Sequence, residues 1–267
     1  MRKTILITGS TDGIGLLTAE KLLAAGHSVI LHGRSQAKLE QAQERLATNS
    51  TGSLSGYLAD LSDMAQVRAL AAKIQQDHPQ LDVLINNAGI YKTSVTRTKD
   101  GMDIRFAVNT VAPYLLTKEL LPLLGSNGRV VNLSSAAQAP VELSALTGET
   151  HLADGPAYAQ SKLALTMWSR QLGLEYKTTG PMIVAVNPGS LLASKMVKDA
   201  FNISGSDLSI GADILIRAAL SEEFASASGE YFDNDARCFS NPHADALNTG
   251  KAGAVTDTIE ALLAKNA

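Results

Sequence analysis

The chain has 267 residues, 45% of them hydrophobic, and a net charge of −3 from 23 basic and 26 acidic side chains. This length and composition allow a large core, so we expect one domain over residues 1–267. Because the charges are spread without runs, a surface for nucleic acid or an anionic membrane is not expected, and small-molecule partners are favoured. Cys238 is the only cysteine and the five histidines are scattered, which excludes internal disulfides and a cysteine-based metal site, so we expect no metal.

Neither a membrane span nor a secretory signal is recognisable in the sequence. No apolar run approaches the ~20 residues that cross a bilayer. The strand-like run TILIT follows the first residues directly, without the pattern of a signal peptide. We therefore expect a cytoplasmic protein.

Short apolar runs alternate with longer amphipathic segments along the chain. Six strands are predicted by KTILIT, HSVILHG, GSLSGYLAD, LDVLINNAG, GRVVNLSS and PMIVAVNPG, and a seventh by GEYFDND near 229–235. Helices are expected at about 13–25, 35–48, 63–77, 101–124, 157–178 and 208–220, with a last one near 252–265. Nearly continuous apolar strands are typical of a parallel sheet covered on both faces. The pattern predicts a single-domain, Rossmann-type α/β fold: a doubly wound parallel sheet of about seven strands with helices on both faces.

Two stretches, 136–156 and the region from 189 to 207, show no clear helical or strand period. In an open parallel sheet the ligand lies beyond the carboxyl ends of the strands, and long loops there are commonly functional. We expect substrate loops around 136–156 and 190–207, with these apolar side chains available to cover a small to medium apolar ligand: Leu143, Leu146, Leu191, Leu192, Met196, Val197 and Phe201. The same side chains could instead close the core beneath the loops.

A glycine-rich turn, TGSTDGIG, follows the first strand. Glycines let the backbone approach a ligand closely, and the free N–H groups at a helix N-terminus attract a diphosphate. The turn predicts a dinucleotide site formed by Thr8, Gly9, Ser10, Thr11, Asp12, Gly13, Ile14 and Gly15. The alternative is a turn that only packs helix against strand, and the glycine spacing differs from the general G-x-G-x-x-G.

The second strand ends in LHGRS, which places Arg34 where NAD enzymes commonly carry an acid for the ribose. A permanently charged guanidinium suits a 2′-phosphate, so NADP(H) is favoured, with NAD(H) possible. The alternative is an arginine that only caps or solvates the loop. His32 in the same strand is interpreted as a surface residue at the strand end.

The chain resembles the short-chain dehydrogenases/reductases in seven motifs that occur in family order: TGSTDGIG at 8–15, AD at 59–60, NNAG at 86–89, VNTVAPYLL around Asn109, VVNLSS at 130–135, YAQSK at 158–162 and NPG at 187–189. The long loop before the YAQSKLA stretch is most similar to the retinol dehydrogenase-like branch. The resemblance implies a further set of cofactor-binding residues: Asp60, Leu61, Asn87, Ala88, Gly89, Tyr158, Lys162, Pro188 and Gly189. Members of the family often have a threonine after the Pro-Gly pair, and here Ser190 or Ser194 would take its place.

Tyr158 and Lys162 are four residues apart and therefore share one face of a helix. The unperturbed pKa of tyrosine is near 10, and we expect Lys162 together with an oxidised nicotinamide to lower the pKa of Tyr158. Tyr158 would then act as the general acid and base of hydride transfer. The resemblance adds Ser135, which would hydrogen-bond the substrate oxygen, and Asn109, which would support Lys162 through backbone and water. Without Ser135 upstream, the Tyr–Lys pair would be interpreted as a surface pair.

Three functions stay open at this point. The first is an NADP(H)-dependent carbonyl reductase or alcohol dehydrogenase, and the second is a non-catalytic NADP(H)-sensing regulatory protein. The third is a nucleotide-sugar epimerase or dehydratase on the same scaffold, although only about 80 residues follow the sixth strand. The resemblance also implies a homodimer or homotetramer built by the long helices near 101–124 and 157–178.

Overall fold

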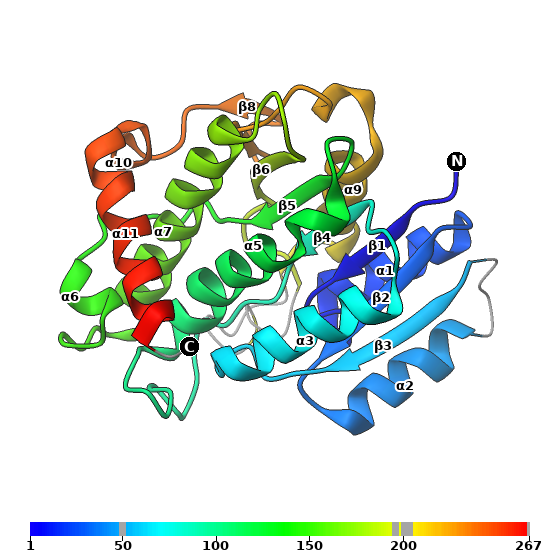
Figure 1. Cartoon of the computed structure of the whole chain (residues 1–267), viewed down its shortest axis with the longest axis horizontal. Coiled ribbons are helices and arrows are strands. Elements are labelled where there is room, and N and C mark those ends of the chain that lie inside the picture. Colours follow the sequence, from blue (N-terminus) through cyan, green and yellow to red (C-terminus); the bar gives the residue numbers. More distant parts are fainter. Residues whose placement is uncertain (48–51, 194–197, 199–204, 266–267) are drawn as a thin grey trace.

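A central sheet runs through the molecule (Figure 1). The computed structural model describes residues 1–47, 52–193, 198 and 205–265. Within these residues, eight strands lie in the order β3-β2-β1-β4-β5-β6-β7-β8. Their bounds are β1 (Thr4–Ile7), β2 (Ser28–Gly33), β3 (Leu54–Leu58), β4 (Val83–Asn86), β5 (Arg129–Leu133), β6 (Met182–Asn187), β7 (Tyr231–Asp233) and β8 (Cys238–Ser240). β1 to β7 pair in parallel, and β8 pairs antiparallel with β7.

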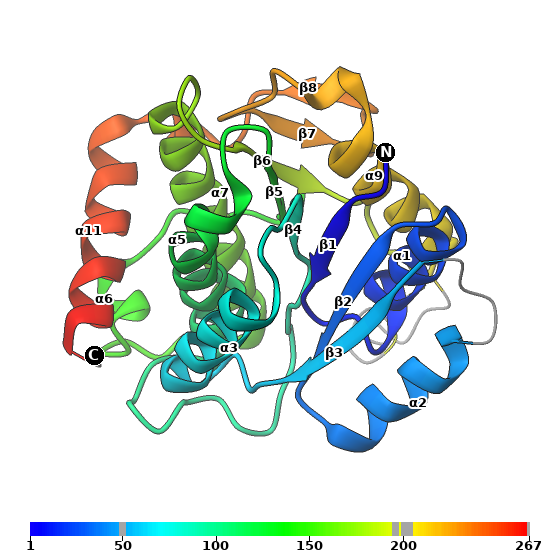
Figure 2. The ribbon, with the colours of Figure 1, turned by 45° about the vertical axis from the view of Figure 1, so that its right-hand side comes forward.

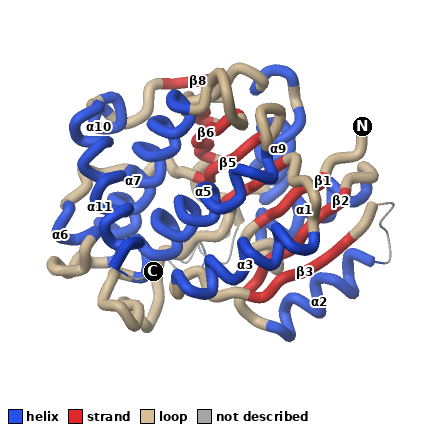
Figure 3. Tube along the Cα trace, viewed as in Figure 1, coloured by secondary structure: helices blue, strands red, loops and turns tan. Residues whose placement is uncertain are grey.

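Helices cover both faces of the sheet, as Figure 3 shows. The longer ones are α1 (Gly13–Ala24), α2 (Gln36–Ala47), α3 (Met64–Asp77), α5 (Ala112–Leu124), α7 (Asp154–Glu175), α9 (Leu208–Leu220) and α11 (Thr249–Lys265). The short ones are α4 (Ile104–Phe106), α6 (Leu143–Leu146), α10 (Ala244–Leu247), a π-helical turn (Ala107–Val111) and a 3₁₀ turn (Glu222–Phe224). The helices α10 and α11 pack on α7 (Figure 1), and Figure 2 shows α11 on the same side of the molecule as α7.

The side chains of each strand alternate between two hydrophobic cores. In β1, Leu6 faces the core shared with α3, α5 and α7, whereas Ile5 and Ile7 face the core shared with α1, α2 and α9. All three side chains are fully buried. Successive side chains of a strand point to opposite faces, so a sheet with two covered faces requires apolar residues at every position. This confirms the doubly wound fold that the continuous apolar strands predict.

The prediction of about seven strands missed β8. This strand has only three residues, Cys238–Ser240, and two of its three side chains are exposed, so it has no apolar run to reveal it. Its pairing with β7 places Phe239 opposite Phe232, and both rings contact Phe224 at centroid distances of 5.0 and 5.1 Å. An aromatic cluster at the sheet edge therefore holds the strand.

Two of the expected helical and loop segments also differ in detail. The helix expected over 101–124 begins at Ile104 and contains the π-helical turn Ala107–Val111 before α5. The stretch 136–156 was expected to lack regular structure, but it includes the short helix α6 and the first turn of α7. Within the described ranges, no helix is long and apolar enough to cross a membrane.

Candidate active site

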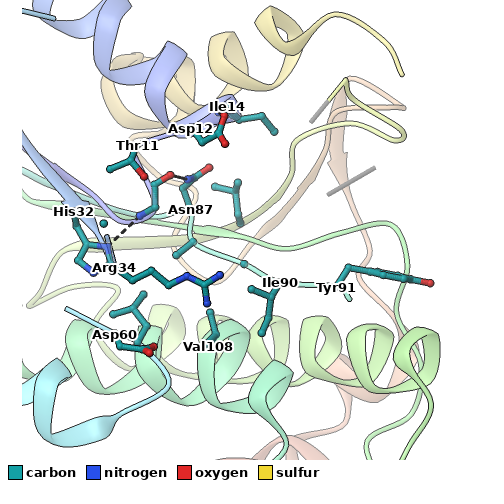
Figure 4. Close-up of a pocket in the computed structure, with 18 of the residues that line it drawn as sticks. Thr11, Asp12, Ile14, His32, Arg34, Asp60, Asn87, Ile90, Tyr91 and Val108 are labelled. Carbon is teal, nitrogen blue, oxygen red and sulfur yellow. Dashed lines mark hydrogen bonds between the residues drawn. The ribbon is translucent and has the colours of Figure 1, made fainter. Parts of the chain in front are cut away.

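A cavity of about 500 Å³ opens at the carboxyl ends of the parallel strands, beside the β1–β4 pair where the strand order reverses (Figure 4). Most of the predicted site residues line it: Gly9, Thr11, Asp12, Gly13, Ile14, Gly15, Arg34, Asp60, Leu61, Asn87, Ala88, Gly89, Tyr158, Lys162 and Pro188. Five predicted residues do not line it: Thr8, Ser10, Asn109, Ser135 and Gly189. Prediction from sequence missed the lining residues His32, Gly33, Lys38, Ala59, Ile90, Tyr91, Lys92, Val108, Leu133 and Ser134.

The glycine-rich turn is tightly packed against the end of β4. Gly9 has a φ of +64°, and a Cβ there would lie 2.9 Å from the Cα of Ala88. A Cβ on Gly15 would lie 2.4 Å from Nδ2 of Asn87, which donates hydrogen bonds to the carbonyls of Thr8 and Gly9. The hydroxyl of Thr8 accepts from the backbone N–H of Asn87 and Ala88. Thr8 therefore does not line the cavity, because its side chain joins the turn to β4.

Asp12 caps the helix that follows the turn. Its carboxylate accepts a hydrogen bond of 2.8 Å from the backbone N–H of Gly13, at the start of α1. At Gly13 a Cβ would meet no atom within 4 Å, so the backbone of the turn is open toward the cavity there. A helix N-terminus beside open space is the arrangement that receives a diphosphate.

His32 is buried, whereas the sequence interpretation placed it at the surface. Only 2% of the residue is exposed, and its ring lies between the glycine-rich turn and the end of β3. Burial lowers the pKa of His32 to about 4, so the ring is neutral at physiological pH. The interpretation failed because a histidine at the end of a strand has the same local pattern whether or not a neighbouring turn covers it.

Arg34 lies at the opposite end of the cavity from Tyr91, and Figure 4 shows its side chain extending into the cavity. The residue is exposed, and its guanidinium has no hydrogen-bond or ion-pair partner within the described part of the chain. Lys38 lines the same end, and its Nζ lies 3.7 Å from the carboxylate of Asp12. The carboxylate of Asp60 accepts two hydrogen bonds from Ser62, at 2.9 and 2.8 Å. An anionic ligand group near Arg34 would thus meet a cation that no carboxylate neutralises.

Lys162 and Tyr158 lie at the other end of the cavity, on α7. The Nζ of Lys162 is buried, donates to the carbonyl of Leu133 at 2.6 Å, and lies 5.8 Å from the centre of the Tyr158 ring. Burial lowers the pKa of Lys162 to about 8. The helix therefore holds a cation close to the tyrosine, as the four-residue spacing predicts.

The pKa of Tyr158 is raised, so Lys162 alone does not lower it, and the expected lowering by Lys162 together with an oxidised nicotinamide stays a prediction. The largest cause is burial, which disfavours the phenolate; a hydrogen bond with Ser135 acts in the opposite direction but does not outweigh it. The expectation counted the attraction of Lys162 and left out the cost of removing the phenolate from water. In the structure, Tyr158 consequently retains its proton at neutral pH.

Asn109 joins two segments that border the cavity. It lies in the π-helical turn, where Oδ1 accepts from the N–H of Ile90 at 2.8 Å and Nδ2 donates to the carbonyl of Ile90 and to Oγ of Ser161. Within the described residues, these hydrogen bonds do not include a direct one to Lys162. Asn109 thus holds the Ile90 segment against α7, and its expected water-mediated support of Lys162 stays a prediction.

Tyr91 is the site residue that sequence motifs had no means of revealing. Its ring lies 4.9 Å from that of Tyr158, centroid to centroid, with the two planes inclined at 52°. The residue is partly exposed and follows Ile90 directly after the NNAG motif. Its position after a strand end was the available signal, although that signal does not show that the ring reaches Tyr158.

The loop after β6 is held by a turn between β7 and β8. Ser190, one of the two serines expected to replace the usual threonine, donates to Asp235 from both N–H and Oγ, at 2.8 and 2.6 Å. The other, Ser194, lies outside the described residues, as do Met196, Val197 and Phe201. The hydroxyl of Ser190 is therefore already bonded to a carboxylate.

The leucines expected to cover the substrate divide into two groups. Leu146 and Leu192 are buried and belong to the core, which is the alternative that the sequence left open. Leu143 is 39% exposed and Leu191 is 48% exposed. Leu143 and Leu191 thus have side-chain surface exposed to solvent, and neither lines the cavity. The described part of the chain contains no cluster of three or more His, Cys, Asp or Glu side chains suited to a metal ion.

Comparison with known proteins agrees with this geometry. A family profile described as short chain dehydrogenase matches residues 3–203. Retinol dehydrogenase 12 of Bos taurus is 34% identical over 256 residues, which cover 91% of this chain and 81% of that protein. The crystal structure of an uncharacterised protein from Mycobacterium paratuberculosis matches with a TM-score of 0.80 and 27% identity, over 97% of this chain and 92% of that one. A short chain dehydrogenase from Shigella flexneri 2a, complexed with NADP, has a TM-score of 0.69 and 27% identity, with coverages of 87% and 97%.

The Rossmann-type sheet and the cavity at its switch point, together with the family match, identify an oxidoreductase of a family that binds NAD(P). The chain belongs to the short-chain dehydrogenase family, in its retinol dehydrogenase-like branch, and acts on CH–OH or carbonyl groups.

Proposed function

We propose that the protein is an NADP(H)-dependent reductase of small to medium apolar carbonyl compounds, with Tyr158 as the general acid and base. The observation that carries the proposal is one cavity with Arg34 at one end and the Tyr158–Lys162 pair at the other. Between these ends lies the open glycine-rich turn, where a diphosphate would be received by backbone N–H groups. The same chemistry runs in reverse on the corresponding alcohol.

The preference for NADP(H) rests on Arg34. A guanidinium without a carboxylate partner favours the doubly charged 2′-phosphate and has no comparable bond to make with a ribose hydroxyl. Lys38 adds a second positive charge at the same end of the cavity. The NADP complex of the Shigella flexneri relative supports this preference by analogy.

The side chains at the other end are suited to moving a proton. A bound NADPH supplies hydride, two electrons and one hydrogen, to the carbonyl carbon. Tyr158, held in its protonated form, donates its proton to the carbonyl oxygen, and the alcohol is the product. Ser135 does not line the cavity but is hydrogen-bonded with Tyr158; it would bond that oxygen as negative charge develops on it, and Lys162 would stabilise the phenolate that remains.

The apolar character of the substrate is supported by Leu143, Leu191 and Tyr91, which present partly exposed apolar surface around the loops 136–156 and 190–207. The relatives named retinol dehydrogenases act, by name, on an apolar alcohol. The proposed homo-oligomer through α5 and α7 stays a prediction, and α11 already occupies part of the surface of α7.

The test is a side-by-side titration of the purified protein with NADPH and NADH, followed by turnover with a panel of apolar aldehydes and ketones. We expect NADPH to bind at least tenfold more tightly, and NADPH to be consumed with an apolar carbonyl but not with a charged one. Tight binding without turnover on any carbonyl would favour the sensing protein. Conversion of nucleotide sugars without net NADPH consumption would favour the epimerase. Preference for NADH would remove the role given to Arg34.

A further inference from the structure

His32 connects three parts of the nucleotide site. Its ring Nδ1 lies 3.2 Å from the backbone nitrogen of Gly9, and its Nε2 lies 3.1 Å from the carbonyl oxygen of Ala59. Its own backbone exchanges two hydrogen bonds of 3.0 Å with Ser10. Gly9 and Ser10 belong to the glycine-rich turn, and Ala59 follows β3 directly before Asp60. One side chain thus spans the turn, β2 and the end of β3.

These contacts determine the position of the ring proton. A backbone N–H only donates, so Nδ1 must accept from Gly9 and carries no hydrogen. A carbonyl only accepts, so Nε2 must donate to Ala59. The ring is therefore the neutral Nε2–H tautomer, in agreement with the low pKa of about 4 that burial produces. A neutral imidazole offers an acceptor and a donor on opposite sides of one rigid ring, and both are used here.

The glycine-rich turn is held from a second side as well. Gly9 also contacts the backbone of Ala88, so closely that a Cβ on Gly9 would lie 2.9 Å from the Cα of Ala88. The turn is thus enclosed between β4 and the ring of His32, which also lines the cavity. Loss of the ring bonds would remove the side-chain link between Gly9 and the end of β3, leaving Ala59 bonded to the carbonyl of Gly33 and Ser10 bonded to the backbone of His32.

We propose that His32 is a positioning residue of the cofactor site, which sets the spacing between the glycine-rich turn and the end of β3 and thereby prepares the pocket for the adenosine half of the dinucleotide. The inference rests on the proposed use of NADP(H). Because Lys162 and Tyr158 lie at the other end of the cavity, the contribution of His32 is to cofactor binding and not to the chemical step.

The test compares His32→Phe with His27→Phe. His27 is a matched control, since its Nδ1 also accepts a backbone N–H, that of Lys3 at 3.1 Å, but it precedes β2 at the far end of the sheet. Binding is measured with NADPH, with 2′,5′-ADP as the adenosine half, and with reduced nicotinamide mononucleotide as the other half. His32→Gln, whose amide supplies both an acceptor and a donor, serves as the conservative variant.

We expect His32→Phe to weaken NADPH and 2′,5′-ADP by about tenfold each, as for the loss of one or two buried hydrogen bonds. The affinity for the mononucleotide should be unchanged, His32→Gln should recover part of the affinity for NADPH, and His27→Phe should bind NADPH like the wild type. Equal weakening of both halves, or unchanged 2′,5′-ADP binding, would overturn the inference. If the wild-type protein binds neither NADPH nor 2′,5′-ADP, the proposed function fails and the inference falls with it.

A measurement on the wild-type protein covers the case in which the variants do not fold. The nitrogen-15 chemical shifts of the His32 ring at pH 7 should show a protonated Nε2 and an unprotonated Nδ1. A charged ring or a proton on Nδ1 would contradict the hydrogen bonds to Gly9 and Ala59, and with them the positioning role.

Discussion

The two ends of the cavity hold their positive charges in opposite ways. At one end, Arg34 is exposed and makes no ion pair with any described residue. At the other end, Lys162 is buried and bonded to the carbonyl of Leu133. An exposed cation costs little to keep and is free to bind a ligand anion, whereas a buried cation is costly unless it is bonded and acts strongly on its neighbours. This contrast fits the proposal that Arg34 selects the cofactor and that Lys162 takes part in the reaction.

The largest expected effect is at the reacting end of the cavity. The substitution Tyr158→Phe removes the proton donor and keeps the ring that contacts Tyr91. Turnover should therefore fall by up to about 10⁴-fold. Binding of NADPH should stay within about threefold, because the ring still fills its place. Steady-state rates with an apolar ketone and the fluorescence of bound NADPH measure the two quantities. A variant that retains a tenth of the activity would rule out Tyr158 as the acid.

The next effect concerns the ion pairs that hold the start of α7. Arg105 is fully buried, donates to Asp103 at 2.6 and 2.8 Å, and also bonds Asp154, four residues before Tyr158. Arg105→Met would leave two carboxylates without their partner, and should lower the free energy of unfolding by about 3–5 kcal/mol in urea titrations.

The control for this prediction is Arg45→Met. The Arg45–Glu20 pair has a similar length of 2.8 Å, but both side chains are exposed, so its loss should cost less than about 1 kcal/mol. If the two variants lost the same free energy of unfolding, burial would not strengthen the contribution of the Arg105 ion pairs to stability.

A third effect appears as a dependence of stability on pH. The pKa of His32 is lowered from 6.5 to about 4 by burial, so between these values the unfolded chain takes up a proton that the folded chain does not. Asp60 lies close enough to oppose the shift in part. Above pH 6.5, His32 therefore does not lower the free energy of unfolding. As the pH falls from 6.5 to about 4, protonation of His32 in the unfolded chain lowers the free energy of unfolding, by roughly 3 kcal/mol in all. Urea unfolding between pH 4.5 and 7.5 should show a steeper loss for the wild type than for His32→Gln. If the free energy of unfolding fell equally with pH in the two proteins, the His32 ring would be exposed to water in the folded state.

The smallest expected effect is at the exposed end. Arg34→Ala should weaken NADPH by about 10- to 30-fold, equivalent to about 1.4–2 kcal/mol, because one charge-assisted contact to the 2′-phosphate is lost. NADH should bind as before, which makes it the control within the same variant. If the affinities for NADPH and NADH fell equally, Arg34 would support the site in general and would not bind the 2′-phosphate specifically.

The parts of the molecule that the sequence predicted correctly are those with a local signal. The apolar runs of β1 to β7, the glycine-rich turn and the four-residue spacing of Tyr158 and Lys162 all leave a pattern within a few residues. The strand β8, the burial of His32 and the contact of Tyr91 with Tyr158 depend on segments distant in sequence. The raised pKa of Tyr158 depends on burial in the same way, so it required the structure.

We propose that hydride passes from NADPH to a carbonyl carbon with Tyr158 as the proton donor. The most direct test uses NADPH that carries deuterium at both C4 positions of the nicotinamide, an apolar carbonyl compound, and mass spectrometry of the alcohol formed. We expect deuterium on the carbinol carbon with the wild-type protein and almost none with Tyr158→Phe, at equal occupancy by NADPH. Tight binding of NADPH by the wild type without deuterium transfer to any carbonyl in the panel would contradict the claim.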